Sequence, residues 1–143
     1  MSVFLLALLL SNSAHRAEHG EPDIVGVLVG KAFLRAVADR DAKSGLPLCA
    51  DRVSFDGKIV KGAKNIFSRL EEMFSRIPRE TRFIKVIGMD HNEMLARFGP
   101  PPDRMASLRI KNSIFVLGRL NKGGLIVILE KVEGRYRVTG LTS

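Results

Sequence analysis

The chain of 143 residues is 45% hydrophobic and 27% charged, a length typical of one domain and an apolar content that excludes a disordered protein. A single cysteine, Cys49, excludes an internal disulfide and a multi-cysteine zinc site. The formal net charge of +8 falls entirely in residues 61–143, which hold sixteen Lys and Arg against eight Asp and Glu. This basic half is compatible either with an anionic partner or with a solvated, solubilising surface.

The amino terminus contains an apolar run, Val3–Leu10, followed by small and polar residues. The run is too short to span a bilayer, which takes about 20 residues as a helix. With Ser11 and Ser13 behind it, the run is typical of a secretory signal, although no Lys or Arg precedes it. We therefore divide the chain into residues 1–20, a signal peptide or tail, and residues 21–143, one domain. The signal interpretation predicts a secreted or periplasmic protein, and the alternative, a segment packed on the domain, predicts a cytoplasmic one.

Apolar residues at helical spacing predict a helix over Ile24–Asp39. Gly26 and Gly30 either weaken this helix or indicate close packing of another element against it. A short second helix or turn is expected over Ala42–Ala50. Val53–Gly62 then predicts a hairpin, because two β-prone runs flank the Asp-Gly pair at positions 56 and 57.

Ala63–Ile77 gives the clearest helix, with a continuous apolar face and Pro78 just beyond its end. The period then changes to two, which is typical of strands, and Asp90–Arg97 forms a helical turn between them. The predicted strands are Arg82–Met89, Ala106–Lys111, Ser113–Leu120, Leu125–Glu130 and Arg135–Leu141. Helices first and strands afterwards predict an α+β domain in which helices cover one face of a curved antiparallel sheet.

The strands Ser113–Leu120 and Leu125–Glu130 are apolar on both faces, which is typical of central strands. One face of the sheet must meet the helices. The other must meet a pocket, a long loop or a second subunit, because a wide apolar patch is rarely left in water. The pattern therefore predicts either a cavity or a homodimer.

Residues 24–142 resemble the nuclear transport factor 2-like (SnoaL-like) superfamily. The resemblance rests on a helix that ends in Ala38-Asp39-Arg40-Asp41, a turn at Leu46-Pro47-Leu48, the Phe55-Asp56-Gly57 hairpin, and Gly62 before a helix with Ile66, Leu70 and Phe74. The final segment, Lys131–Val138, is similar to the last strand of that family, with Tyr136 where Trp is usual.

The resemblance implies a cystatin-like cone, in which a curved sheet wraps a helix and encloses an apolar pocket, and a homodimer through the outer sheet face. The bound molecule would be small and apolar or acidic. The aromatic candidates for lining the pocket are Phe33, Phe55, Phe74, Phe115 and Tyr136. Enzymes of the superfamily use a helix-borne Tyr or a His pair with Tyr and Asp partners. Here the only Tyr lies on a strand and His91 is the only His of the domain, so the resemblance implies a binding domain with no secure catalytic set.

Four residues are candidates for chemistry. Asp90 and His91 fit a general base oriented by a carboxylate, or a solvated pair in a surface turn. Asp56 is either a pocket carboxylate or a turn residue, and Cys49 is either a nucleophile or an inert apolar thiol. The main alternative function is therefore an isomerase, cyclase or hydrolase that uses His91 or a pocket carboxylate.

A second alternative is a module that binds an anionic macromolecule through the basic carboxyl-terminal half. Six basic residues fall on neighbouring predicted strands: Lys85, Arg109, Lys111, Arg119, Arg135 and Arg137. Nucleic acid is disfavoured as the partner because the one aromatic residue interleaved with them, Tyr136, falls on the opposite face of its strand and cannot stack on bases there. No metal site is predicted, since His15 and His19 fall in the amino-terminal tail and the domain lacks a second His beside His91. No cofactor is predicted, since Gly123-Gly124 lacks the strand-loop-helix context of a phosphate loop.

Overall fold

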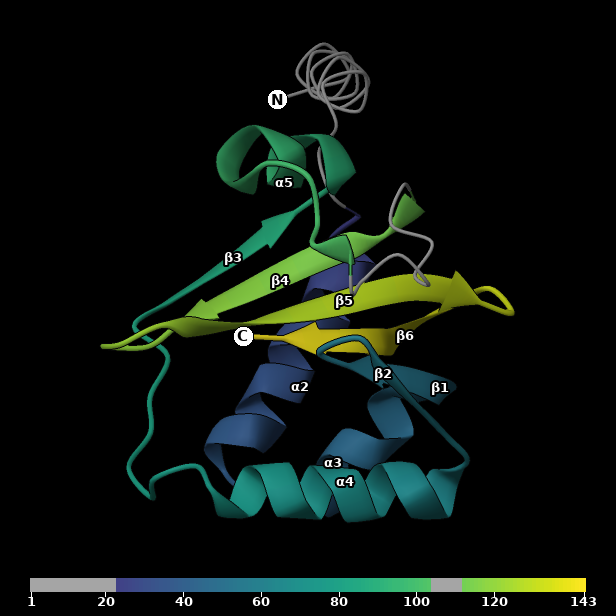
Figure 1. The fold of residues 1–143 in the computed structure, drawn as a ribbon, viewed down its shortest axis with the longest axis vertical. Helices are drawn as coiled ribbons and strands as arrows, with labels where there is room; N and C mark the ends of the chain where they lie inside the picture. The colour runs from purple at the N-terminus through teal and green to yellow at the C-terminus, as the bar shows by residue number, and fades with distance from the viewer. Residues whose placement is uncertain (1–22, 104–111) are drawn as a thin grey trace, which may run out of the picture.

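The computed structural model describes residues 23–103 and 112–143, and these form one sheet with helices on both faces. The helices are α2 (Ile24–Ala38), α3 (Ala42–Gly45), the 3-10 turn η1 (Leu46–Leu48), α4 (Ala63–Ser75) and α5 (His91–Phe98). The strands are β1 (Cys49–Phe55), β2 (Lys58–Lys61), β3 (Lys85–Met89), β4 (Ile114–Arg119), β5 (Gly124–Val132) and β6 (Arg135–Thr142). Figure 1 shows them in the order of the chain. The α+β class predicted from the sequence is confirmed.

The six strands form an open sheet in the order β2-β1-β6-β5-β4-β3. The pairs β1–β2, β3–β4, β4–β5 and β5–β6 are antiparallel, but β1 and β6 pair parallel, so the expectation of a purely antiparallel sheet was wrong. After β3 at the far edge, the chain runs back through β4 and β5 to β6, which lies beside β1 and points in the same direction as β1. As the two-sided apolar patterns predicted, β4 and β5 are interior strands of this sheet.

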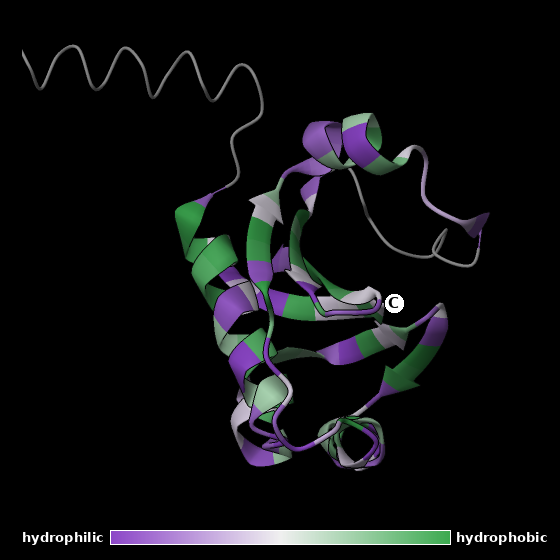
Figure 2. Ribbon diagram, turned by 90° about the vertical axis from the view of Figure 1, so that its left-hand side faces the viewer, coloured by the Kyte–Doolittle hydropathy of each residue, from purple (hydrophilic) through white to green (hydrophobic). Residues whose placement is uncertain are grey.

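Helix α2 lies against one face of the sheet at very short range, and glycine makes this approach possible. A Cβ added at Gly30 would lie 2.8 Å from Cβ of Val116, and one at Gly26 would lie 2.5 Å from Cδ1 of Ile114. The sheet contributes its own glycine at Gly88, where an added Cβ would lie 2.5 Å from the side chain of Val27. The two helix glycines therefore mark close packing of α2 against the sheet, the second of the two interpretations given above. Figure 2 shows the ribbon of α2 alongside the sheet.

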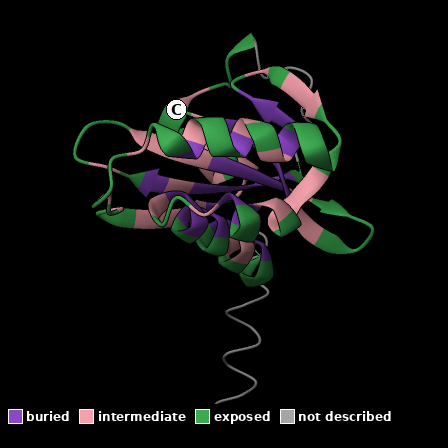
Figure 3. Ribbon diagram, turned by 90° about the horizontal axis from the view of Figure 1, so that it is seen from below, coloured by how far each residue is buried: buried purple, intermediate pink, exposed green. Residues whose placement is uncertain are grey.

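The main core lies between the helices and this face of the sheet. It joins Phe33 and Leu34 of α2, Leu70 and Phe74 of α4, and Val116 of β4, all of them buried. Figure 3, the view from below, shows buried central strands behind helices that alternate between buried and exposed residues. The predicted amphipathic helix over 63–77 therefore exists and buries its apolar face as expected, with its last helical residue at Ser75.

The opposite face carries a second, smaller apolar cluster made of Met89, Phe115 and Ile128. Alternation along β4 explains its position, because Phe115 points away from the face to which Val116 contributes. Met94 of α5 packs against this cluster, so α5 covers part of the face that the sequence left without a helical partner.

Several element boundaries differ from those expected. The strand expected over Arg82–Met89 begins only at Lys85, and the turn expected over Asp90–Arg97 is helix α5. The short helix expected over Ala42–Ala50 is split into α3 and η1, since Pro47 interrupts it and Cys49 already starts β1. The strand expected over Ala106–Lys111 lies outside the described residues.

Candidate functional site

A pocket of about 350 Å³ lies between α4, the segment after it and the helix-covered face of the sheet. We call it the helix-side pocket. Its apolar lining comes from Val37, Phe55, Met73, Ile77, Pro78, Phe83, Leu120, Leu125 and Leu141. The charged residues that line it are Asp56, Arg69 and Arg76.

Arg69 and Met73 lie on α4 and Arg76 is its C-cap residue, and the three are spaced as neighbours along one side of the helix. Arg69 lies over the ring of Phe55, with its guanidinium carbon 5.6 Å from the ring centroid. One nitrogen of Arg69 and one of Arg76 pair with Glu72, at 3.2 Å and 3.0 Å. Each guanidinium has five N–H donors, so both retain donors for an oxygen atom of a bound molecule.

Asp56 is at once a turn residue and a pocket residue. Its φ of 52° and the φ of 92° at Gly57 are the positive values of a two-residue hairpin turn. Its Oδ1 accepts hydrogen bonds from Oγ1 of Thr142 at 2.7 Å and from the backbone N–H of Ser143 at 3.3 Å. The carboxylate therefore fastens the end of β6 to the hairpin, which supports the turn interpretation.

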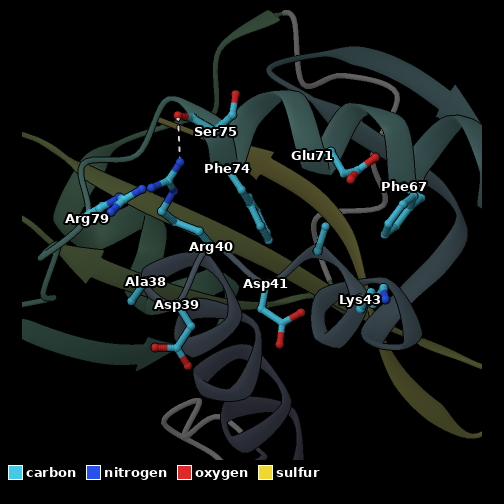
Figure 4. Close-up of a pocket in the computed structure, with 11 residues that line it drawn as sticks. Ala38, Asp39, Arg40, Asp41, Lys43, Phe67, Glu71, Phe74, Ser75 and Arg79 are labelled. Carbon is cyan, nitrogen blue, oxygen red and sulfur yellow. Dashed lines mark hydrogen bonds between the residues drawn. The ribbon is translucent and has the colours of Figure 1, made fainter.

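A wider groove of about 710 Å³ lies between the α2–α3 turn and α4 (Figure 4). We call it the charged groove, because acidic and basic side chains line it together: Asp39, Arg40, Asp41, Lys43, Glu71 and Arg79. Several of these groups already serve the fold. Arg40 donates to the backbone carbonyl of Ser75 at 3.5 Å, and Asp41 caps α3 by accepting from Ser44. The hydroxyl and then the backbone N–H of Ser44 hold the pKa of Asp41 below its usual range.

The five aromatic residues expected to line one pocket are spread over the molecule. Phe55 lines the helix-side pocket, whereas Phe115 lies on the opposite face of the sheet. Phe33 and Phe74 pack edge to face in the core, with ring centroids 6.1 Å apart. Tyr136 donates its hydroxyl to Oδ2 of Asp23 at 3.2 Å and so ties β6 to the start of α2. Burial, and then the carboxylate of Asp23, raise the pKa of the Tyr136 phenol.

The pair Asp90 and His91 lies at the start of α5, away from the helix-side pocket. Asp90 is the N-cap of the helix, and its Oδ1 accepts the backbone N–H of Glu93 at 2.8 Å. His91 lines a separate pocket on the other face of the sheet. The carboxylate expected to orient the histidine therefore serves as a helix cap.

Cys49 begins β1 in a groove beside Pro47, Arg135 and Arg137. Its thiol is half-buried and donates weakly to the carbonyl of Gly45 at 3.5 Å. Burial raises the pKa of this thiol to about 12, although the charge of Arg137 acts in the opposite direction. These surroundings favour an inert thiol over a nucleophile.

We expect Cys49 to resist alkylation in the folded protein. With the pKa raised from 9.0 to about 12, the thiolate fraction at pH 8 falls by about 10³-fold relative to the unfolded chain. Iodoacetamide should therefore react about 10³-fold more slowly in buffer than in denaturing urea at the same pH, with labelling followed by mass spectrometry. Equal rates in the two solvents would show that folding does not raise the pKa of this thiol.

Within residues 23–103 and 112–143, no helix combines the length and the apolarity needed to cross a membrane. The same part of the chain holds no group of three or more His, Cys, Asp or Glu side chains arranged to bind a metal ion.

Fold and pockets together define an α+β domain with an open, mixed six-stranded sheet covered by helices. Neither a family model nor a curated protein sequence matches the chain. Among solved structures, it is similar to a DUF4783 family protein from Bacteroides ovatus, with 16% identity and a TM-score of 0.44 over 77% of this chain and 88% of that one.

Sequence reasoning missed most of the helix-side pocket. The apolar periodicity of Ala63–Ile77 predicts a buried helix face, but it does not predict that Arg69 and Arg76 line a pocket together with Met73. The spacing of Arg69, Met73 and Arg76, by four and then three residues, is the sequence pattern that could have indicated this pocket. It places two cations at the margin of the apolar stripe of the helix.

Proposed function

We propose that the protein is a small-molecule-binding domain of the nuclear transport factor 2-like type and that its ligand occupies the helix-side pocket. The supporting observation is a pocket between helices and sheet that receives apolar side chains from α2, α4, β1, β5 and β6. Its volume of about 350 Å³ lies within the range of about 300–1,000 Å³ that is usual for ligand sites. An apolar wall with a few polar groups at one side is also the composition of such sites.

The ligand that fits this lining is a small apolar molecule with one anionic oxygen group. The apolar part would contact Met73, Phe83 and Leu125, and the oxygen atoms would accept hydrogen bonds from Arg69 and Arg76. Arginine suits this task because its planar fork of donors matches a carboxylate. Asp56 lines the same pocket, but Thr142 and Ser143 already donate to its carboxylate.

The alternatives have less support. An isomerase, cyclase or hydrolase would need a base in the pocket, yet His91 lines a different one and Asp56 is engaged by β6. For an anionic macromolecule, Lys85 and Arg119 lie opposite each other on the sheet, but Arg137 lies opposite Glu130 and donates to the carbonyl of Pro47. Arg109 and Lys111 lie outside the described residues. The homodimer stays a prediction.

Octanoate tests this proposal, with octanol as an uncharged control of similar length. We expect octanoate to raise the melting temperature and to bind more tightly than octanol by calorimetry. Arg76→Gln should weaken octanoate binding by about two- to five-fold, as expected for an exposed charge contact, and leave octanol binding unchanged. Arg35→Gln is the matched control, since Arg35 is exposed on α2 and pairs with Asp39. If neither molecule perturbs the NMR signals of Met73 and Leu125, the proposed site is wrong.

A further inference from the structure

One side of α2 faces away from the sheet and is exposed along most of the helix. We call it the outer stripe, and its residues are Ile24, Val25, Leu28, Lys31, Ala32 and Arg35. The three large apolar side chains among them, Ile24, Val25 and Leu28, are 71%, 56% and 57% exposed. With 3.6 residues per turn, the six positions fall within about 120° of the helix circumference, so they form one continuous surface.

The outer stripe has an apolar half at the start of α2 and a basic half further along. Residues 24–38 contain neither Asp nor Glu, so every charge on the stripe is positive. The acidic groups at the two ends of the helix are already engaged. Asp23 accepts hydrogen bonds from the backbone N–H of Val25 and from the hydroxyl of Tyr136, and Asp39 pairs with Arg35 at 3.8 Å.

The apolar half is a contiguous patch, because Leu28 follows Ile24 by four residues and Val25 by three. Contiguous exposed apolar side chains mark a surface that meets another molecule, whereas scattered ones do not. The chain also enters α2 at this half. Residues 11–22 separate the entry point from the apolar run Val3–Leu10, a distance of at most about 40 Å along an extended chain.

We propose that the outer stripe docks onto an anionic lipid bilayer, with Ile24, Val25 and Leu28 inserted beneath the headgroups and Lys31 and Arg35 against the lipid phosphates. Apolar side chains next to basic ones are the composition of helices that lie in the membrane interface. Lysine and arginine can bury their aliphatic stems beside such a patch while their charges stay at the headgroups. The net charge of +8 adds long-range attraction to an anionic surface.

A second copy of the chain fits the stripe less well than a bilayer does. Two stripes in contact would set the cations of one against the cations or the apolar side chains of the other, with no acidic residue on either stripe to pair with them. Charge complementarity therefore favours the lipid surface.

Vesicles of phosphatidylcholine, with or without an equal part of phosphatidylglycerol, are the probes, and sedimentation of the full chain measures binding. We expect binding to the mixed vesicles to be at least about ten-fold tighter than to phosphatidylcholine alone. Leu28→Gln and Lys31→Gln should each weaken it by about five-fold. The matched controls are Ile84→Gln, at a residue 66% exposed before β3, and Lys58→Gln, at an exposed residue of β2, and neither should change the affinity.

Insertion is measured separately from charge attraction. The chain has no tryptophan, so a single introduced one reports only its own surroundings. Leu28→Trp should shift its fluorescence to shorter wavelength on the mixed vesicles and should be quenched by brominated acyl chains. Ile84→Trp should show neither effect.

Three results would overturn the proposal. The first is a chain that does not sediment with the mixed vesicles. The second is an equal loss for Lys31→Gln and Lys58→Gln with an unshifted Leu28→Trp, because overall charge would then attract the protein without insertion. The third is a dimer in the absence of lipid that Leu28→Gln dissociates, because a second copy would then cover the stripe. The six residues of the outer stripe do not line the helix-side pocket, so each result leaves the proposed function standing.

Discussion

Phe33→Ala is expected to lower the free energy of unfolding by about 3–5 kcal/mol, as measured by urea denaturation. Phe33 is 0% exposed and packs edge to face against Phe74, and both belong to the core between the helices and the sheet. The loss combines the transfer free energy of the ring with the cost of the cavity that it leaves. This cavity cannot collapse easily, because α2 is held against the sheet by its glycine contacts.

Phe98→Ala is the matched control for this substitution. Phe98 also lies on a helix, but it is 53% exposed, so its removal should change the free energy of unfolding by less than about 1 kcal/mol. A double-mutant cycle with Phe74→Leu should also give a coupling of about 0.5–1.5 kcal/mol for the ring pair. Equal losses for Phe33→Ala and Phe98→Ala would contradict the packing described for the core.

Gly30→Ala should destabilise the protein by about 1–3 kcal/mol, although alanine favours helices by about 1 kcal/mol over glycine. The added Cβ would collide with Cγ2 of Val116 and would lie 2.8 Å from its Cβ and 3.1 Å from Cδ1 of Leu129. Val116 is buried on an interior strand, so it has nowhere to move. Urea denaturation again gives the measurement.

Two further variants separate this collision from a general effect of glycine replacement. At Gly45 an added Cβ would make ordinary contacts of 3.5 Å with Phe33 and Phe74, and φ is −76°, so Gly45→Ala should be neutral or stabilising by about 0.4–1 kcal/mol. Adding Val116→Ala to Gly30→Ala should recover part of the loss by making room. If the two substitutions were simply additive, the close approach of α2 to the sheet would be refuted.

Local patterns predicted local structure well. The Asp-Gly pair at 56 and 57 specified the hairpin, in which Phe55 and Lys58 are paired, because only a tight turn with two positive φ values closes two residues. The apolar periodicity of α4 likewise predicted which side it buries. The two-sided apolar pattern of β4 and β5 predicted their interior positions, because both of their faces must be covered.

Features that depend on distant parts of the chain escaped prediction. The parallel pairing of β1 with β6 joins segments about 90 residues apart, and no local pattern encodes such a partner. The set of residues that line the helix-side pocket escaped prediction for the same reason. Aromatic residue type alone could not separate Phe55, at the helix-side pocket, from Phe115, on the other face, because each face assignment depends on the sheet register and on where α5 lies.

The pairing of β1 with β6 also bears on how quickly the native state can form. Although the β1–β2 hairpin and α4 are complete by Ser75, the place beside β1 in the centre of the sheet is filled only by residues 135–142. Pairings of such high sequence separation slow folding, because the entropy of closing a long loop must be lost first. During synthesis, the edge of β1 that later pairs with β6 would therefore stay unpaired until β6 is made. We expect the contacts of Asp56 with Thr142 and Ser143 to form late on the folding pathway.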